Sequence, residues 1–202
     1  MALLILGTGG HAKVALDIAL ELGLGVTGFL DDDPNKTGSS IHGFPVLGAI
    51  DAWQDHGSQL FIAIGNNRIR KAIVERLGSG PDWMTLVHPK ATVSRFAEIG
   101  KGSLIAFGAC VGPDATLGDF SIVNSSSSVD HDCKVGNYAH IAVGAHLAGI
   151  VTVGEGAFVG AGATAIPAVV IGNWSVVGAG ATVIRPVPDG QTYVGTPAKP
   201  IN

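Results

Sequence analysis

The stretch that decides the fold is residues 99–135, which read IGKGSLIAFGACVGPDATLGDFSIVNSSSSVDHDCKV. An aliphatic residue recurs in it every six positions, and the same step holds from position 87 to position 183. Sixteen of the seventeen positions on this step are Val, Ile or Leu, and the exception, Ala165, is also apolar. Neither an α-helix nor a flat strand has a period of six. The step is typical of a coil with three flat sides of six residues, each turning one aliphatic side chain inward.

A second period supports three sides per coil. Gly100, Gly118, Gly136, Gly154 and Gly172 are spaced by eighteen, so one glycine would mark the same corner of every coil. Glycine suits such a corner because the backbone there needs a positive φ or a close approach to another segment. Successive coils would stack about 4.8 Å apart as parallel strands, and only a stack buries the inward faces. We therefore predict an all-β parallel β-helix over residues 85–185.

Upstream of the repeats, residues 1–84 alternate strands with helices. Apolar runs predict strands at 3–6, 26–30 and 60–64, and helical spacing predicts helices over 12–22 and 69–77. This order is half of a doubly wound α/β sheet, a half-Rossmann domain. Downstream, residues 186–202 are rich in proline. We expect this C-terminal tail to leave the coils and to cap the open end of the stack, an edge that would otherwise pair with other chains.

Composition excludes several classes of protein. Twelve Lys and Arg against sixteen Asp and Glu argue against nucleic-acid binding. Charged residues make up 14% of a chain rich in aliphatics, which excludes a disordered protein. No uninterrupted apolar run reaches about 18 residues, so we expect no membrane insertion. Two cysteines are too few for a disulfide framework, and we recognise no signal peptide, so the expected compartment is the cytoplasm.

The first predicted strand leads into a glycine turn. Gly7, Gly9 and Ala12 fit the pattern G-x-G-x-x-A, which places a phosphate group at a helix N-terminus. A nucleotide-linked sugar, a dinucleotide such as NAD or FAD, and a plain structural turn remain open as interpretations. The small number of strands argues against a dinucleotide.

Polar residues follow all three predicted strands, at the edge where α/β sheets bind ligands. The pair Asp31 and Asp32 could accept hydrogen bonds from a base or a ribose, or could form an acidic turn before Pro34. Gly65 and Asn66 follow the third strand. The residues that we predict to bind a nucleotide-linked substrate are Gly9, Gly10, His11, Asp31, Asp32, Gly65 and Asn66.

Several local strings narrow the family. They are GTGGH at 7–11, FLDD at 29–32, AIGNNRIRK at 63–71, VDHDC at 129–133 and GTPAK at 195–199. The whole chain resembles the hexapeptide-repeat family of sugar O-acyltransferases and sialic-acid O-acetyltransferases. It is most similar to the bacterial enzymes that N-acetylate UDP-linked 4-amino-4,6-dideoxy sugars of bacillosamine-type glycans. The resemblance implies a left-handed coil, a homotrimer and acetyl-CoA as co-substrate. The hexad spacing does not set the hand, and the usual chirality rule favours right-handed connections.

Acetyl transfer from a thioester to an amine requires a base, and histidine is suited to this role near neutral pH. His131 follows the inward Val129, and Gly149 lies one coil later, where it would leave room for a substrate. The resemblance implies that His131 is the catalytic base and that Asp132, where most of the family has Glu, raises its basicity. Adjacent strand residues face opposite ways, so this pair must sit at a corner, or the carboxylate must act by its field alone.

His140 lies nine residues from His131, half a coil away, so the two should lie on different sides of one prism. If both serve one site, it must lie between neighbouring prisms, as a cyclic trimer would provide. The resemblance implies that His140 contacts the thioester end of acetyl-CoA. An interface role for His140 is the alternative. The positions matching the family's other CoA contacts are Asn124, Gly149, Ala161 and Ala179, each of which could also be a tight corner. We expect no metal site, because no ligand spacing is present.

The function predicted from the sequence is acetyl-CoA-dependent N-acetylation of a UDP-linked 4-amino-4,6-dideoxy sugar, by direct transfer with a histidine base. O-acetylation of sialic acid is the rival reaction. A trimeric nucleotide-sugar-binding scaffold without catalysis is a rival of a different class, and a nicotinamide-dependent enzyme is more distant. The residues do not separate a UDP carrier from a GDP carrier.

Overall fold

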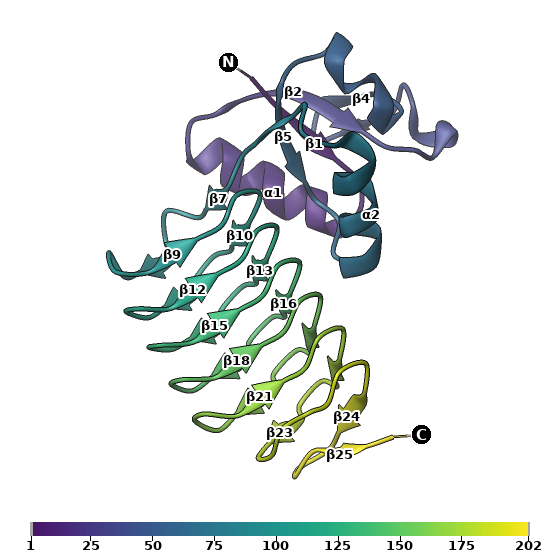
Figure 1. Cartoon of the computed structure of the whole chain (residues 1–202). Helices are drawn as coiled ribbons and strands as arrows, with labels where there is room; N and C mark the ends of the chain where they lie inside the picture. The colour runs from purple at the N-terminus through teal and green to yellow at the C-terminus, as the bar shows by residue number, and fades with distance from the viewer. Residues whose placement is uncertain (1, 202) are drawn as a thin grey trace. The chain divides into compact units, whose positions relative to one another are not determined.

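The computed structural model describes residues 2–201, and the chain divides into two compact units between Pro89 and Lys90. Figure 1 draws the alternating strands and helices of the first unit in purple and blue, and the stacked coils of the second in teal to yellow.

The first unit is built on one sheet with the strand order β3-β4-β2-β1-β5-β6. Its neighbours are parallel except for the antiparallel pair β3 and β4. The strands are β1 (Ala2–Leu6), β2 (Gly25–Leu30), β3 (Ser40–Ile41), β4 (Phe44–Gly48), β5 (Gln59–Ile62) and β6 (Asp82–Trp83), and β7 (Leu86–Val87) follows. The helices are α1 (Gly10–Glu21) and α2 (Asn67–Leu77), with 3-10 turns η1 (Pro34–Lys36) and η2 (Ile50–Asp55). The predicted strands and helices are all present.

The helices α1 and α2 begin just after β1 and β5, and their N-termini are capped differently. The N-cap of α1 is Gly9, which offers no side-chain hydrogen bond to the first turn. The N-cap of α2 is Asn66, whose Oδ1 accepts from the backbone N–H groups of Arg68 at 3.0 Å and Ile69 at 3.1 Å. Thus a side chain caps the N-terminus of α2, whereas no side chain caps that of α1.

The second unit is a parallel β-helix with three faces, and between residues 92 and 183 every strand pairs with the strand eighteen residues away. The first face holds β10 (Leu104–Ile105), β13 (Ile122–Val123), β16 (His140–Ile141), β19 (Phe158–Val159), β22 (Val176–Val177), β24 (Thr192–Val194) and β25 (Lys199–Pro200). The second face holds β8 (Thr92–Val93), β11 (Cys110–Val111), β14 (Ser128–Val129), β17 (His146–Leu147), β20 (Thr164–Ala165) and β23 (Thr182–Val183). The third face holds β9 (Glu98–Ile99), β12 (Thr116–Leu117), β15 (Lys134–Val135), β18 (Thr152–Val153) and β21 (Val170–Ile171).

The six-residue step is the inward column of this prism. Each strand has two residues, and its second residue is the aliphatic one from the repeat. From Ile105 to Val183 all of these positions are buried, whereas Val93 and Ile99 in the first coil are half-buried. The core is therefore a column of aliphatic side chains that each coil extends by three.

The glycine column lies at the corner between the third and first faces, and close approach is the reason for it. These five glycines have no positive φ. A Cβ on Gly136 would lie 2.6 Å from the backbone nitrogen of Glu155 in the next coil. The positive φ falls two residues later, where Tyr138 has φ 58° and stacks on Phe120 with ring centroids 5.3 Å apart. A positive φ and a close approach to another segment were both expected to favour glycine at these corners, and the structure shows the close approach.

The expectation that the tail leaves the coils at residue 186 is wrong for its first part. Val187 bridges to Ile171, and β24 pairs in parallel with β22. The tail makes one more partial coil, shortened by two residues, because Asp189 contacts Asn173 at a separation of 16 in place of 18. Only then does β25 reverse and pair antiparallel with β24.

Candidate active site

A pocket of about 500 Å³ opens in the first unit, where β1, β2 and β5 end. Five of the seven residues predicted to bind the nucleotide-linked substrate line it, and Asp32 and Asn66 do not. The lining residues are Gly7, Thr8, Gly9, Gly10, His11, Asp31, Ala63, Ile64, Gly65 and Ile69. The carboxyl edge of the sheet therefore carries a pocket, with the uncapped start of α1 at its wall.

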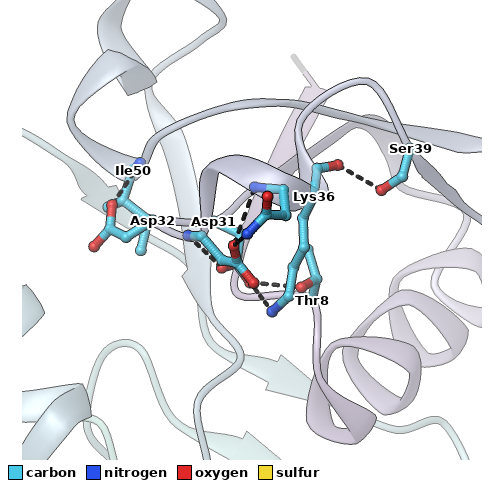
Figure 2. A network of polar contacts seen from close by, with 8 residues as sticks. Thr8, Asp31, Asp32, Lys36, Ser39 and Ile50 are labelled. Carbon is cyan, nitrogen blue, oxygen red and sulfur yellow. Dashed lines mark hydrogen bonds and ion pairs between the residues drawn. The ribbon is translucent and has the colours of Figure 1, made fainter.

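Asp31 is held by a network of donors at this pocket, which Figure 2 shows. Thr8 donates its hydroxyl to Oδ2 at 2.5 Å, Lys36 Nζ lies 3.1 Å from the same oxygen, and the backbone N–H of Asp33 donates to Oδ1 at 3.0 Å. Burial acts to raise the pKa of Asp31, but these hydrogen bonds and the Lys36 charge outweigh it and lower the pKa. Asp31 is thus an ionised, oriented carboxylate that also fixes Lys36.

Asp32 points away from the pocket, and protein groups contact both of its oxygens. The backbone N–H of Ile50 donates to Oδ1 at 3.1 Å, and Arg76 Nη2 lies 2.8 Å from Oδ2. Figure 2 shows Asp32 directed to Ile50. Asp32 and Asn66 thus fix the turns around the pocket, one tying β2 to η2 and the other capping α2.

His11 lies in the first turn of α1 and lines the same pocket. Burial and the nearby positive charge of Arg70 lower the pKa of His11 to about 4. Arg70 is 1% exposed, and it donates to the carbonyl of Ile64 at 2.8 Å and to Oδ1 of Asn67 at 2.9 Å. The imidazole of His11 is therefore neutral near pH 7.

This shifted pKa predicts a pH dependence of stability. The unfolded chain binds a proton at His11 near pH 6.5 and the folded chain only near pH 4, so stability falls as pH falls through this window. We expect His11 to account for a loss of about 3 kcal/mol between pH 7 and pH 4. Urea unfolding at several pH values, compared with His11→Asn, measures it. Parallel pH curves for the two proteins would contradict the assignment.

In the β-helix, His131 and Asp132 lie at the corner between β14 on the second face and β15 on the third. Asp132 has φ 58°, and this left-handed turn directs its carboxylate back to the preceding residue. His131 Nδ1 lies 2.8 Å from Asp132 Oδ2, and the two side chains are 51% and 57% exposed. The corner geometry thus makes direct contact between two adjacent residues possible.

The hydrogen bond to Asp132 raises the pKa of His131, and the charges of Asp130 and Asp132 add to the rise. With Nδ1–H donated to the carboxylate, Nε2 of the neutral ring carries the lone pair. The ring thus presents a nitrogen that can accept a proton, Nε2, on the side opposite the contact with Asp132.

Glycines of the two neighbouring coils lie against His131, one against its ring and one against its backbone. A Cβ on Gly149, in the next coil, would lie 2.5 Å from Nε2 of His131. A Cβ on Gly112, in the preceding coil, would lie 2.8 Å from the backbone nitrogen of His131. The side chain of His131 therefore has its present position only because residue 149 has no side chain.

Asp130 is a candidate functional residue that the sequence analysis missed. Its Oδ1 accepts the backbone N–H of His131 at 2.7 Å. It lines a groove of about 320 Å³ on the second face. The groove residues are Thr92, Val93, Ser94, Cys110, Val111, Gly112, Pro113, Ser128, Val129 and Asp130. The available signal was an acidic residue on each side of one histidine, but only the following one was considered.

The residues predicted to bind CoA fall into two groups. Asn124, Ala161 and Ala179 lie at the corner between the first and second faces, where Asn124 Nδ2 is 3.2 Å from His140 Nε2. His140 is 7% exposed on β16, and its ring meets Phe158 edge-on at 5.2 Å. Gly149 lies instead beside His131, at the next corner. The prediction that His131 and His140 lie on different sides of the prism is confirmed, and one chain does not bring them together.

Residues 2–201 contain neither a membrane-spanning helix nor a cluster of metal-ligating side chains. Within that range no helix is long and apolar enough to cross a bilayer. The same range holds no group of three or more His, Cys, Asp or Glu side chains arranged to ligate a metal.

Comparisons of sequence find a matching family and curated relatives. A profile of the family described as the PglD N-terminal domain matches residues 2–77. The UDP-N-acetylbacillosamine N-acetyltransferase of Bacillus subtilis (strain 168) is 41% identical over 106 residues, covering 50% of this chain and 49% of that protein. An uncharacterized protein of Acanthamoeba polyphaga mimivirus is 35% identical over 98 residues, covering 48% of this chain and 19% of that protein. The chain thus spans half or less of the length of these curated relatives.

Solved structures match over the whole chain. PerB from Caulobacter crescentus, in complex with CoA and GDP-perosamine, is 38% identical with a TM-score of 0.95, covering 100% of this chain and 98% of that chain. The acetyltransferase domain of PglB from Neisseria gonorrhoeae is 38% identical with a TM-score of 0.92, covering 99% of each chain. That domain is also known in complex with acetyl coenzyme A.

Proposed function

The chain belongs to the hexapeptide-repeat sugar acyltransferases in which a PglD-type N-terminal domain precedes a left-handed parallel β-helix, and we propose that it is an acetyl-CoA-dependent N-acetyltransferase of a nucleotide-linked 4-amino-4,6-dideoxy sugar. The observation that carries the proposal is the corner pair His131 and Asp132, joined at 2.8 Å, with the bare Gly149 against the ring. The names of the relatives, which include a UDP-linked and a GDP-linked amino-sugar compound, support the substrate class.

In this proposal His131 and Asp132 catalyse direct transfer of the acetyl group from acetyl-CoA to the acceptor amine. Nε2 of His131 accepts a proton from the acceptor amine as its nitrogen attacks the thioester carbonyl carbon. A C–N bond forms, the C–S bond breaks, and the CoA thiolate takes the proton back from the imidazolium. Asp132 keeps Nδ1–H oriented and stabilises the imidazolium. An acyl-enzyme is not required, because the acceptor itself is the nucleophile.

The nucleotide belongs in the pocket of the first unit. The diphosphate lies at the uncapped start of α1, near Gly9 and Gly10, where backbone donors and the helix dipole favour an anion. Lys36 forms an ion pair with Asp31, which lines the pocket, and so supplies a positive charge next to it. We propose UDP as the carrier. We also place the reaction in the cytoplasm, with which the free thiols of Cys110 and Cys133 agree.

We propose that the active enzyme is a homotrimer whose three reaction sites lie between neighbouring prisms. His131 and His140 lie on different sides of one prism, so one site would take His131 from one chain and His140 from the next. Exposed apolar side chains at the two corners beside the second face support such packing, among them Phe107, Val143 and Ile150. The CoA arm would then run along Asn124, Gly149, Ala161 and Ala179.

A mixing experiment tests the shared site. The His131→Ala and His140→Ala chains should each be nearly inactive alone, but co-expressed chains should form mixed trimers. In a random mixture about a quarter of the sites receive both native histidines, so about a quarter of wild-type activity should return. Light scattering should give a trimer mass of ~61 kDa from the 20.4 kDa chain. Mixed trimers that stay inactive would show that the two histidines do not share a site.

The reaction itself is tested by release of the CoA thiol. The protein is supplied with acetyl-CoA and, in separate assays, with UDP-linked and GDP-linked 4-amino-4,6-dideoxy sugars and with sialic acid. We expect turnover with the UDP-linked amine. Turnover only with the GDP compound would correct the carrier, and turnover only with sialic acid would replace the reaction by O-acetylation. Binding of the nucleotide sugar without thiol release from any acceptor would favour a scaffold.

A further inference from the structure

The groove on the second face ends beside the proposed base. Its polar side chains other than Asp130 are the hydroxyls of Thr92, Ser94 and Ser128 and the thiol of Cys110. Asp130 is the charged residue in its lining. A ligand in this groove therefore meets small polar groups along its length and one carboxylate next to His131.

The position of Asp130 is fixed by the backbone of the corner. Its Oδ1 accepts the backbone N–H of His131 at 2.7 Å, and its own N–H donates to the carbonyl of Leu147 at 3.1 Å. Gly112 lets the preceding coil approach the backbone between Asp130 and His131. One carboxylate oxygen is thus occupied by the corner, and the exposed side chain presents the charge to the groove.

We propose that Asp130 binds the protonated amino group of the acceptor and places it beside His131, so that this carboxylate selects amine over hydroxyl acceptors. The inference rests on the proposed function and names the residue that makes the reaction an N-acetylation. An aliphatic amine is largely an ammonium ion at pH 7, and a carboxylate binds it through a charge-assisted hydrogen bond. A hydroxyl acceptor carries no positive charge, so its hydrogen bond to Asp130 contributes less to binding.

The ammonium group of the acceptor loses two protons in the reaction, and water accepts the first of them. The bound ammonium releases one proton to solvent, and the neutral amine then attacks the thioester. The second proton passes to Nε2 of His131 and on to the leaving thiolate. The overall change converts an ammonium and a thioester into an amide, a thiol and one free proton. Asp130 positions the amine and is unchanged at the end.

The test compares two ligands that differ at one atom. Calorimetry measures binding of a UDP-linked 4-amino-4,6-dideoxy sugar and of the UDP-linked 6-deoxy sugar with a hydroxyl at C4, using the full chain. We expect the wild type to bind the amine ~10-fold or more tightly, because a hydrogen bond between charged groups is the stronger kind. Asp130→Asn can still accept the N–H of His131, but it should bring the two affinities within ~2-fold of each other. Asp130→Glu should restore part of the preference.

Asp114→Asn is the matched control, because Asp114 is an exposed aspartate at the same row of corners, one coil before Asp132, and lies outside the groove lining. It should keep the wild-type preference. If Asp130 has a purely structural role, Asp130→Asn should weaken the binding of both ligands equally. An unchanged preference for the amine in a folded Asp130→Asn protein would overturn the inference. A wild type that binds both ligands alike, but acetylates the amine, would also overturn it. A wild type that acetylates no nucleotide amino sugar would instead overturn the proposed function.

Discussion

Replacing His131 by Ala should lower kcat by ~10²–10⁴-fold, the range that a well-placed general base contributes. The structure gives the reason, because His131 Nδ1 is held 2.8 Å from Asp132 while Gly149 keeps the Nε2 side of the ring clear of a side chain. No other imidazole lies at this corner within residues 2–201. Steady-state acetylation with a nucleotide-linked amino sugar measures the loss, and the KM for acetyl-CoA should change little.

The side chain of His131 is half exposed, so its loss should leave the melting temperature near that of the wild type. His56→Ala is the control, since it removes a half-exposed imidazole from the first unit and should keep full activity. If His131→Ala retains a third or more of the wild-type kcat, His131 is not the general base. Catalysis would then depend on binding and orientation alone.

The β-helix was predictable because its rule repeats in every coil. The six-residue step gave the inward column from Ile105 to Val183, and the eighteen-residue step gave the register of all three faces. From the same register, Gly149 was expected one coil above His131, and the structure shows it against the ring. Periodicity averages over many residues, so one irregular position such as Ala165 does not disturb it.

Features that depend on single contacts were not predictable in the same way. Nothing in the sequence separates Asp31, which faces the pocket, from Asp32, whose oxygens are held by Ile50 and Arg76. These partners lie 18 and 44 residues away, and their pairing depends on tertiary packing. The strand β4 (Phe44–Gly48) was missed because Pro45 and Gly48 interrupt its short apolar run. The shortened last coil was missed because Pro186 and Pro188 predict a break in the ladder, although Val187 between them still pairs with Ile171.

Gly149→Ala should lower kcat by about 10²-fold, a misplacement effect, while leaving the fold intact. The added methyl group would collide with Cε1 and Nε2 of His131, which belong to an exposed and rotatable side chain. The ring therefore has to turn away from the position that Asp132 fixes. The collision costs little stability because the ring has solvent to move into. Activity and thermal melting measured on the same sample separate the two effects.

Gly154→Ala is the matched contrast. Its methyl group would lie 2.5 Å from the backbone nitrogen of Asn173, at a corner that does not contain His131. Backbone in a stack of hydrogen-bonded coils cannot turn away, so this variant should lose ~1–3 kcal/mol of stability, and the protein that remains folded should keep its kcat. The added methyl group thus displaces the ring of His131 in Gly149→Ala and the backbone of the β-helix in Gly154→Ala. If Gly149→Ala instead melts early and keeps its turnover, the glycine serves the coil, and the ring of His131 does not depend on it.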